Sequence, residues 1–272
     1  MEFLNQINYD LIKLIKKNQN TKQSTFIGKI DDKDLIISIN PIIIDKIDSK
    51  NLINSISCEN IKVIVSNDRY HKYLIDQNSK IDFTVIYPAL ECDILKYCKD
   101  DLGLYIETYD DYMKNIYPNI VGKSVEWIDN IMNHKFEHEF ILYEDEDYIL
   151  MPDMKWNRID ISDMYCLAIV KDKTLMSIRE LTAKDISLLE KIRNISLRII
   201  NEKYDIPQYK IKAYFHYPPS FYQLHIHFNM IDYIQFGTTC VAGHSLNSVI
   251  NNLKISSDYY QRVDIEKWYA IN

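Results

Sequence analysis

The residues best suited to chemistry are two histidines one residue apart, His225 and His227, in the segment 222–228. Side chains alternate between the two faces of a β-strand, so a strand here places Gln223, His225 and His227 on one face. A neutral imidazole keeps a lone pair near neutral pH and attacks phosphorus well, and an adjacent imidazole or amide can stabilise the charge that develops. The pattern therefore fits nucleophilic chemistry on a phosphate.

Two other interpretations of these histidines stay open at this point. The spacing HxH on a strand also occurs in metal sites, where two imidazoles join a third ligand. Histidines on a strand can also be purely structural. The heptapeptide alone does not choose among the three.

The scarcity of glycine limits which phosphate-binding folds the chain can adopt. The chain has 5 glycines in 272 residues, and neither a GxxxxGK loop nor a GxGxxG fingerprint can be written from them. P-loop and dinucleotide-binding folds are therefore excluded. If the protein handles phosphates, side chains must do most of the holding.

The composition bounds the class of protein and its partners. Hydrophobic residues make up 47% and charged residues 26%, as in an ordinary globular protein. The 32 basic and 39 acidic residues give a net charge of −7, which offers no electrostatic case for binding long nucleic acid. No stretch approaches the roughly 20 apolar residues of a membrane span, and we expect no secretory leader. Five cysteines without a CxxC pair indicate free thiols in a reducing compartment, the cytoplasm with the nucleus as an alternative.

Three separated blocks of sequence carry a resemblance to a known family. They are His216-Tyr217-x-Pro219-Ser220-x-Tyr222-x-Leu224-His225-x-His227-Phe228, Pro152-Asp153-Met154-Lys155-Trp156-Asn157, and a stretch from Val85 through Lys96-Tyr97 to Tyr112. In this order they resemble the scavenger mRNA decapping enzymes of the histidine-triad superfamily. The resemblance covers roughly residues 60 to 262 and leaves the more divergent first part of the chain unplaced.

The resemblance implies a reaction and the residues that perform it. The protein would hydrolyse a 7-methylguanosine cap dinucleotide or a short capped oligonucleotide to 7-methyl-GMP and a nucleoside diphosphate, with no metal or other cofactor. His225 would be the nucleophile that forms a nucleotidyl-histidine, and His227 would support the phosphate. His216 and Ser220 would line the same chamber, and Gln223 stands where the family has its first triad histidine.

The resemblance also implies a pocket for the cap. Trp127 falls on the tryptophan that stacks on the methylated guanine, Met154 would close the opposite face, and Glu137 falls on the acid that pairs with the guanine edge. Methylation at N7 makes guanine a cation, which gains up to about 2 kcal/mol over a desolvated indole face. A glutamate can accept both guanine protons as a bidentate pair. The remaining implied contacts to base, ribose and phosphates are Pro152, Asp153, Lys155, Asn67 and Lys96.

Two departures from the family pattern concern the phosphate contacts. Gln223 can form hydrogen bonds but cannot become cationic. The family also has a basic residue in the loop after the histidine strand, whereas loop 237–244 has no arginine and offers His244 as a candidate substitute. We expect an active enzyme with altered kinetics. The alternatives are a hydrolase of other dinucleotide polyphosphates and a non-catalytic protein that sequesters capped fragments.

Hydrophobic patterning predicts the elements that position these residues. In the first part of the chain it predicts an amphipathic helix over 4–15, strands at 25–27, 35–39, 61–65 and 83–87, and a helix over 89–99. Further along it predicts a helix over 124–132 capped by Ser124, strands at 140–143, 148–151, 165–170, 211–216 and 222–229, and a long helix over 186–199. Thr182 to Asp185 resembles a capping box before that long helix.

Together these patterns predict a two-domain α+β protein. A β-rich N-terminal domain (1–98) and a hinge (99–122) precede a histidine-triad domain (123–272) with an antiparallel sheet flanked by helices. By resemblance the protein would be a homodimer with exchanged N-terminal segments and with each active site between the two domains. Neither a membrane nor long duplex nucleic acid is expected as a partner.

Overall fold

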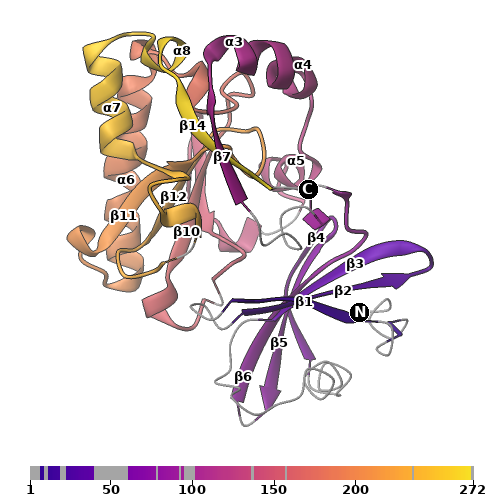
Figure 1. Ribbon diagram of the computed structural model, residues 1–272. Coiled ribbons are helices and arrows are strands. Elements are labelled where there is room, and N and C mark those ends of the chain that lie inside the picture. Colours follow the sequence, from indigo (N-terminus) through magenta and orange to yellow (C-terminus); the bar gives the residue numbers. More distant parts are fainter. Residues whose placement is uncertain are drawn as a thin grey trace. The chain divides into compact units, whose positions relative to one another are not determined.

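A computed structural model describes residues 7–8, 12–18, 23–39, 61–77, 79–91, 93–94, 102–135, 138–156, 158–234 and 236–270 (Figure 1). The chain divides into two compact units, Met1–Leu102 with Ala270–Asn272, and Gly103–Tyr269. Both units contain antiparallel sheets, and helices flank the larger sheet of the second unit, so the predicted α+β class is confirmed. No helix within these ranges is long and apolar enough to cross a membrane.

The first unit is built on a six-stranded antiparallel sheet of order β1-β2-β3-β6-β5-β4. Its strands are β1 (Lys13–Asn18), β2 (Gln23–Ile30), β3 (Lys33–Ile39), β4 (Ile61–Asn67), β5 (Tyr70–Gln77) and β6 (Ser79–Ile86). Alternate side chains such as Phe26, Ile37 and Phe83 form the core on one face. On the other face Ile36 packs with Ile94, which lies in a helical turn around 91–94.

Sequence patterning predicted this unit only in part. The helix over 4–15 is wrong where the structure describes it, because residues 13–15 lie in β1 and pair with β2. Strand pairing overrides the weak local preference for a helix. The four predicted strands coincide with parts of β2, β3, β4 and β6, except that the last extends one residue beyond the end of β6. Strand β5 was missed because its Lys72 is charged yet buried, 2.9 Å from Asp82. Of the helix predicted over 89–99, residues 91, 93 and 94 are helical, and 92 and 95–99 lie outside the described residues.

The second unit has a six-stranded antiparallel sheet of order β13-β11-β12-β10-β9-β8. Its strands are β8 (Tyr143–Glu144), β9 (Tyr148–Pro152), β10 (Tyr165–Val170), β11 (Ile211–His216), β12 (His225–Met230) and β13 (Gly243–Ser245). Helices α6 (Ile186–Tyr204) and α7 (Leu246–Ile255) pack on one face (Figure 1), where Ile226 and Phe228 join the main core. The short helix α5 (Glu126–Met132) covers the other face, against Leu167 and Ile169.

A two-stranded ribbon of β7 (Leu102–Glu107) and β14 (Ile265–Ala270) completes this unit. The remaining elements are α3 (Tyr109–Asp111), the π-helical turn η3 (Tyr112–Ile116), α4 (Tyr117–Ile120), α8 (Tyr259–Arg262) and the 3-10 turns η4 (His138–Phe140), η5 (Ile161–Asp163), η6 (Ile178–Glu180), η7 (Ala183–Asp185), η8 (Gln208–Lys210) and η9 (Phe236–Thr238). Residues 103–122, most of the predicted hinge, therefore group with the second unit.

The predicted strands 165–170 and 211–216 coincide with β10 and β11 residue for residue. The capping box at Thr182 is present and leads through η7 into α6. Helix α5 begins two residues later than predicted, with Val125 at its cap position in place of Ser124. The strand predicted over 140–143 is wrong for 140–142, because the chain forms η4 up to Phe140 and only β8 follows. The last predicted strand starts at His225, and the residues before it form an irregular loop.

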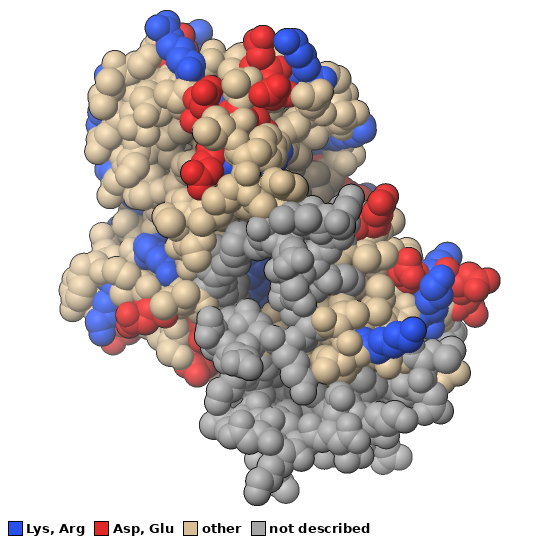
Figure 2. All heavy atoms as spheres, in the orientation of Figure 1, with Lys and Arg blue, Asp and Glu red and all other residues tan. Residues whose placement is uncertain are grey.

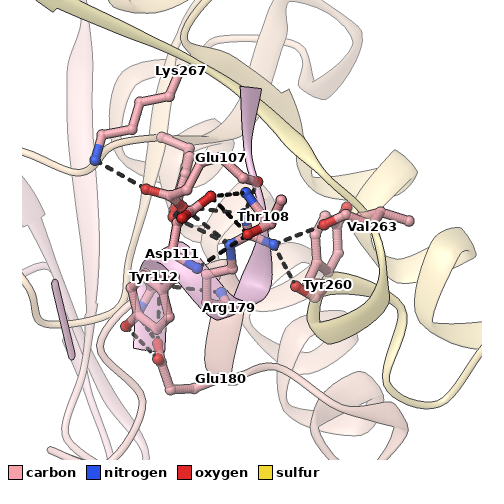
Figure 3. Close-up of polar contacts among 11 residues, drawn as sticks. Glu107, Thr108, Asp111, Tyr112, Arg179, Glu180, Tyr260, Val263 and Lys267 are labelled. Atoms are coloured by element: carbon pink, nitrogen blue, oxygen red, sulfur yellow. Dashed lines mark hydrogen bonds and ion pairs between the residues drawn. The ribbon is translucent and has the colours of Figure 1, made fainter. Parts of the chain in front are cut away.

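A buried ion pair joins the ribbon to the rest of this unit (Figure 3). The guanidinium of Arg179, in η6, is fully buried and donates to Oε1 of Glu107 at 3.1 Å. It also donates to the backbone oxygens of Glu107 at 2.8 Å, Tyr260 at 2.8 Å and Val263 at 2.9 Å. One side chain thus satisfies acceptors on β7, on α8 and on the segment before β14.

The other partners of Glu107 extend this network toward β11. Lys267 Nζ donates to Oε2 of Glu107 at 3.0 Å, and the hydroxyl of Tyr217 donates to Oε1. Burial, followed by this hydrogen bond, raises the pKa of Tyr217 well above its usual value, so the hydroxyl keeps its proton. Because Tyr217 directly follows His216, the network fixes the start of the loop that leads to β12.

Replacing Arg179 with methionine should destabilise the second unit by about 3–5 kcal/mol, because the buried Glu107 carboxylate loses one of its two cationic partners and three carbonyl oxygens lose the guanidinium donor. All three tryptophans of the chain lie in this unit, so the urea dependence of tryptophan fluorescence measures it directly. The matched control is Arg262→Met, which removes an exposed guanidinium paired with Asp258 and should cost less than about 1 kcal/mol. Equal losses for the two variants would contradict the central role of Arg179.

Candidate active site

Three imidazoles lie together where β11 ends and β12 begins. His225 and His227 are buried on β12, directly opposite Ile169 and Leu167 of β10. The ring centroids of His225 and His227 are 4.8 Å apart. His216, the last residue of β11, places its ring centroid 3.9 Å from that of His227. The structure thus brings together the three histidines that the sequence singled out, with His227 in the middle.

The hydrogen bond at Nδ1 of His225 fixes the tautomer of this ring. Nδ1 lies 2.7 Å from the backbone oxygen of Gln223. A carbonyl oxygen can only accept a hydrogen bond, so Nδ1 carries the proton and the lone pair of the neutral ring is on Nε2. This is the protonation pattern that a nucleophilic imidazole needs.

The side chain of Gln223 does not follow the alternation that we expected. Gln223 precedes β12, and its amide nitrogen donates to the backbone oxygens of Val170 at 2.6 Å and Asp172 at 3.2 Å. An amide has two N–H groups for these two acceptors, whereas a neutral imidazole has one. The glutamine therefore ties the loop before β12 to the end of β10.

A lysine and a tyrosine stand beside His227. The hydroxyl of Tyr165 lies 2.8 Å from Nδ1 of His227, and Lys155 Nζ lies 3.4 Å from the same hydroxyl. Burial raises the pKa of Tyr165 well above its usual value, so the phenol stays protonated. The ammonium group of Lys155 is thus positioned next to the histidines, where it can bind a phosphate chain.

A second tyrosine packs on the same imidazole. The ring of Tyr214 stacks on His227 at 5.3 Å and 23°, and its hydroxyl accepts a hydrogen bond from the amide of Asn229 at 3.1 Å. Burial raises the pKa of Tyr214 to about 12. The stacked, neutral tyrosine restricts rotation of the His227 ring.

The loop after β12 closes over His216. A Cβ atom at Gly237 would lie 2.2 Å from Nε2 of His216, so only glycine permits this approach. On β13, directly after this loop, His244 packs edge-on against Tyr217, with 6.3 Å between the ring centroids. Burial, and then the positive charge of Arg179, lower the pKa of His244. A histidine that is held neutral does not replace a cation, so the structure does not support the expected substitution of His244 for the family's loop base.

The described residues expected to bind the cap base lie on α5 and at or just after the end of β9. Trp127 is half-buried on α5 and packs with the apolar cluster under that helix. Pro152 is buried at the end of β9, and Met154 is half-buried in the turn that follows. The carboxylate of Asp153 accepts from the backbone N–H of Lys155 at 2.8 Å, so Asp153 holds the turn that presents Lys155.

The four predicted contacts that remain are Ser220, Asn67, Glu137 and Lys96. Ser220 is exposed in the loop before β12. Asn67 belongs to the first unit, where it is buried at the end of β4, before a tight turn in which Asp68 has a φ of 50°. Glu137 and Lys96 lie outside the described residues. The roles of these four residues stay predictions.

Tyr165, Tyr214 and Phe221 were not predicted to contribute to the site. For Tyr214 the signal was present, since it lies two residues before His216 on one strand and therefore shares its face. Tyr165 could be found only from the pairing of Leu167 with His227, which local patterning does not give. Within the described residues, no group of three or more histidines, cysteines and acids could hold a metal ion.

Family models and curated relatives both relate the chain to the scavenger mRNA decapping enzymes. Residues 5–100 match the N-terminal model of the scavenger mRNA decapping enzymes, and residues 126–238 match their C-terminal binding model. The m7GpppX diphosphatase of Ascaris suum is 41% identical over 74% of this chain and 70% of that relative. The Schizosaccharomyces pombe enzyme of the same name is 30% identical over 93% of this chain and 88% of the relative. The Bos taurus enzyme is 35% identical, and the match spans 72% of this chain but only 61% of the longer relative.

Solved structures give a weaker likeness. Hnt3 in complex with DNA and guanosine aligns with 49% of this chain and 80% of its own, at 20% identity and a TM-score of 0.35. The aprataxin ortholog Hnt3 from Schizosaccharomyces pombe aligns with 51% and 79%, at 17% identity and a TM-score of 0.33.

The tautomer of His225 can be tested directly. In ¹⁵N-labelled protein above neutral pH, two-bond correlation spectra should show Nδ1 of His225 protonated and Nε2 unprotonated, because the Gln223 carbonyl accepts from Nδ1. The resonance is assigned by its loss in His225→Asn and its persistence in His134→Asn, which removes an exposed histidine. A ring protonated at Nε2 would rule out attack by that nitrogen.

Proposed function

The chain belongs to the scavenger mRNA decapping enzyme family, and from this premise we propose that it hydrolyses the triphosphate bridge of 7-methylguanosine cap dinucleotides and short capped oligonucleotides. The products are 7-methyl-GMP and a nucleoside diphosphate. The observation that carries this proposal is the hydrogen bond of His225 to the Gln223 carbonyl, which puts the lone pair on Nε2. The enzyme names of the relatives from Ascaris suum and Schizosaccharomyces pombe support the same chemistry.

The reaction proceeds in two displacements at one phosphorus. Nε2 of His225 attacks the phosphorus that bears the 7-methylguanosine, a P–N bond forms, and the P–O bond to the bridging oxygen breaks, releasing the nucleoside diphosphate. Water then attacks the same phosphorus, the P–N bond breaks, and Nε2 recovers its lone pair. His227 stands beside the nucleophile, and the ammonium of Lys155 lies next to the Tyr165 hydroxyl that bonds His227. Both would stabilise the charge on the phosphate oxygens. This scheme involves no metal ion.

The surface charge supports short substrates. Among the described residues on the face shown in Figure 2, basic and acidic side chains are interspersed, without a broad basic stripe. With a net charge of −7, the chain has no electrostatic surplus for holding a long RNA. The substrate is therefore recognised through the cap and its phosphates.

Removing the nucleophile should abolish hydrolysis. His225→Asn should lower kcat on a cap dinucleotide by about 10⁴-fold or more, as for other covalent nucleophiles, while the cap analogue still binds. His134→Asn, the exposed control, should turn over at the wild-type rate. Mass spectrometry of the products distinguishes hydrolysis from sequestration, because a protein that only sequesters capped fragments would form no 7-methyl-GMP. Full turnover by His225→Asn would rule out the covalent mechanism, and equal rates on unmethylated dinucleotide polyphosphates would favour a general hydrolase.

The cap pocket is tested by the preference for the methylated base. A cation stacked on the indole of Trp127 should gain about 1–2 kcal/mol, which corresponds to roughly 5–30-fold tighter binding of methylated over plain guanosine caps. Trp127→Ala should remove most of this preference and weaken both ligands. Calorimetric titrations in the His225→Asn background measure both affinities, with Trp268→Ala on β14 as the matched tryptophan control. A preference that survives in Trp127→Ala would place the cap pocket elsewhere.

We also propose that the protein is a homodimer. The ribbon of β7 and β14 has only two strands among the described residues, so each strand keeps an outer edge that another chain can cover. Leu104 and Ile106 on this ribbon are 51% and 66% exposed. Apolar side chains on an open strand edge favour association with a second copy.

Charges on the ribbon should therefore weaken the dimer. The double variant Leu104→Lys and Ile106→Lys should shift the protein toward monomer, because ammonium groups would have to be buried at the interface. Light scattering after size-exclusion chromatography at several concentrations measures the change. Ile255→Lys, at an isoleucine that is 79% exposed at the end of α7, is the control. A monomeric wild type would refute the proposal, and a dimer unchanged in the double variant would refute this interface.

A further inference from the structure

The ring of Phe221 contacts both the cap-stacking tryptophan and the nucleophile. Its centroid lies 3.9 Å from that of the His225 imidazole, with the two planes 19° apart. The same ring meets the indole of Trp127 edge to face, at 4.9 Å and 88°. At this separation no water fits between Phe221 and His225, so the phenylalanine covers one face of the nucleophile.

Phe221 is itself held from several sides. It packs on the apolar cluster of Ile128, Ile131, Ile149, Met151, Leu167 and Ile169. The loop that carries it is anchored at its start, where Tyr217 bonds Glu107, and at its end, where the Gln223 amide bonds Val170 and Asp172. With both ends of the loop fixed, the position of the aromatic ring is fixed as well.

The nucleophile needs this second constraint. The hydrogen bond from Nδ1 to the Gln223 carbonyl holds one atom of the His225 ring. The χ2 torsion of a histidine has a broad range of allowed values, so one hydrogen bond leaves the plane of the imidazole able to tilt. A stacked aromatic ring opposes this tilt and keeps Nε2 pointed in one direction.

We propose that Phe221 is a positioning residue for the decapping reaction, whose stacked ring sets the plane of the His225 imidazole and whose contact with Trp127 makes that plane depend on a base stacked in the cap pocket. This inference rests on the proposed function for its kinetic consequences. A base on Trp127 restrains the indole, the indole restrains Phe221, and Phe221 restrains the nucleophile. Binding energy from the cap base is thereby used to align the attacking nitrogen.

The test compares an apolar and an aromatic replacement at this position. Phe221→Leu keeps the apolar contacts but loses the stack, and Phe221→Tyr keeps the stack. In Phe221→Leu the release of nucleoside diphosphate in a single turnover should slow on the order of 10–100-fold with KM changed by less than about threefold, and Phe221→Tyr should recover most of the rate. Phe140→Leu, at a half-buried phenylalanine of η4 outside the site, is the matched control and should leave the rate unchanged. A Phe221→Leu variant as fast as the wild type, or a Phe221→Tyr variant as slow as Phe221→Leu, would overturn the proposal.

A second measurement does not depend on turnover. The stacked ring should shift the carbon-bound protons of the His225 imidazole upfield, and this ring-current shift should be lost in Phe221→Leu and kept in Phe221→Tyr. If the protein hydrolysed no cap, the proposed function would fail while the shift still reported the stack. An unchanged shift in Phe221→Leu would show that the ring does not lie on the nucleophile and would overturn the inference by itself.

The dependence on the cap pocket is tested by a double-mutant cycle. If Trp127 acts through Phe221, the effects of Trp127→Ala and Phe221→Leu on kcat at saturating substrate should not multiply, and the double variant should be nearly as active as the slower single one. Effects that multiply fully would show that the two rings act independently and would overturn this part of the proposal.

Discussion

The geometry of the active site depends on the buried guanidinium of Arg179. A fully desolvated charge persists in a protein only when a counter-charge and enough acceptors surround it. Arg179 meets this requirement with the Glu107 carboxylate and with three backbone oxygens from two segments of the chain, Glu107 on β7 and residues 260 and 263 around the end of α8. Because Tyr217 shares the Glu107 carboxylate, the same requirement fixes the residue next to His216. A buried polar network therefore anchors the loop between β11 and β12 at its start.

Much of the sheet around the site could be predicted from local sequence. Strand 165–170 is a continuous run of apolar and aromatic residues, and strand 211–216 is mostly apolar and aromatic; the structure reproduces their limits as β10 and β11. The shared face of His225 and His227 follows from strand alternation alone. The proximity of His225 and His227 was therefore predictable without any tertiary information, whereas their catalytic roles stay predictions.

The features that local sequence did not predict depend on partners far away along the chain. Whether Tyr165 reaches His227 depends on the register of β10 against β12, two strands that are separated by the whole of α6. The role of Gln223 depends on where β12 begins, and its amide is engaged by carbonyls more than 50 positions earlier. Strand β5 was missed because it contains the charged Lys72, whose burial is stabilised by an ion pair with Asp82 on the next strand. Each of these features is decided by a contact that no short window of sequence contains.

In the proposed mechanism, the uncharged hydrogen-bond partner of His225 affects the lifetime of the nucleotidyl-histidine. When Nε2 is bonded to phosphorus and Nδ1 keeps its proton, the ring carries a full positive charge. The Gln223 carbonyl accepts the hydrogen bond but cannot take the proton, whereas a carboxylate in its place would lower that charge. The imidazole therefore remains a good leaving group, and the P–N bond stays easy for water to cleave. A backbone oxygen at this position favours rapid release of the nucleotide over its storage on the enzyme.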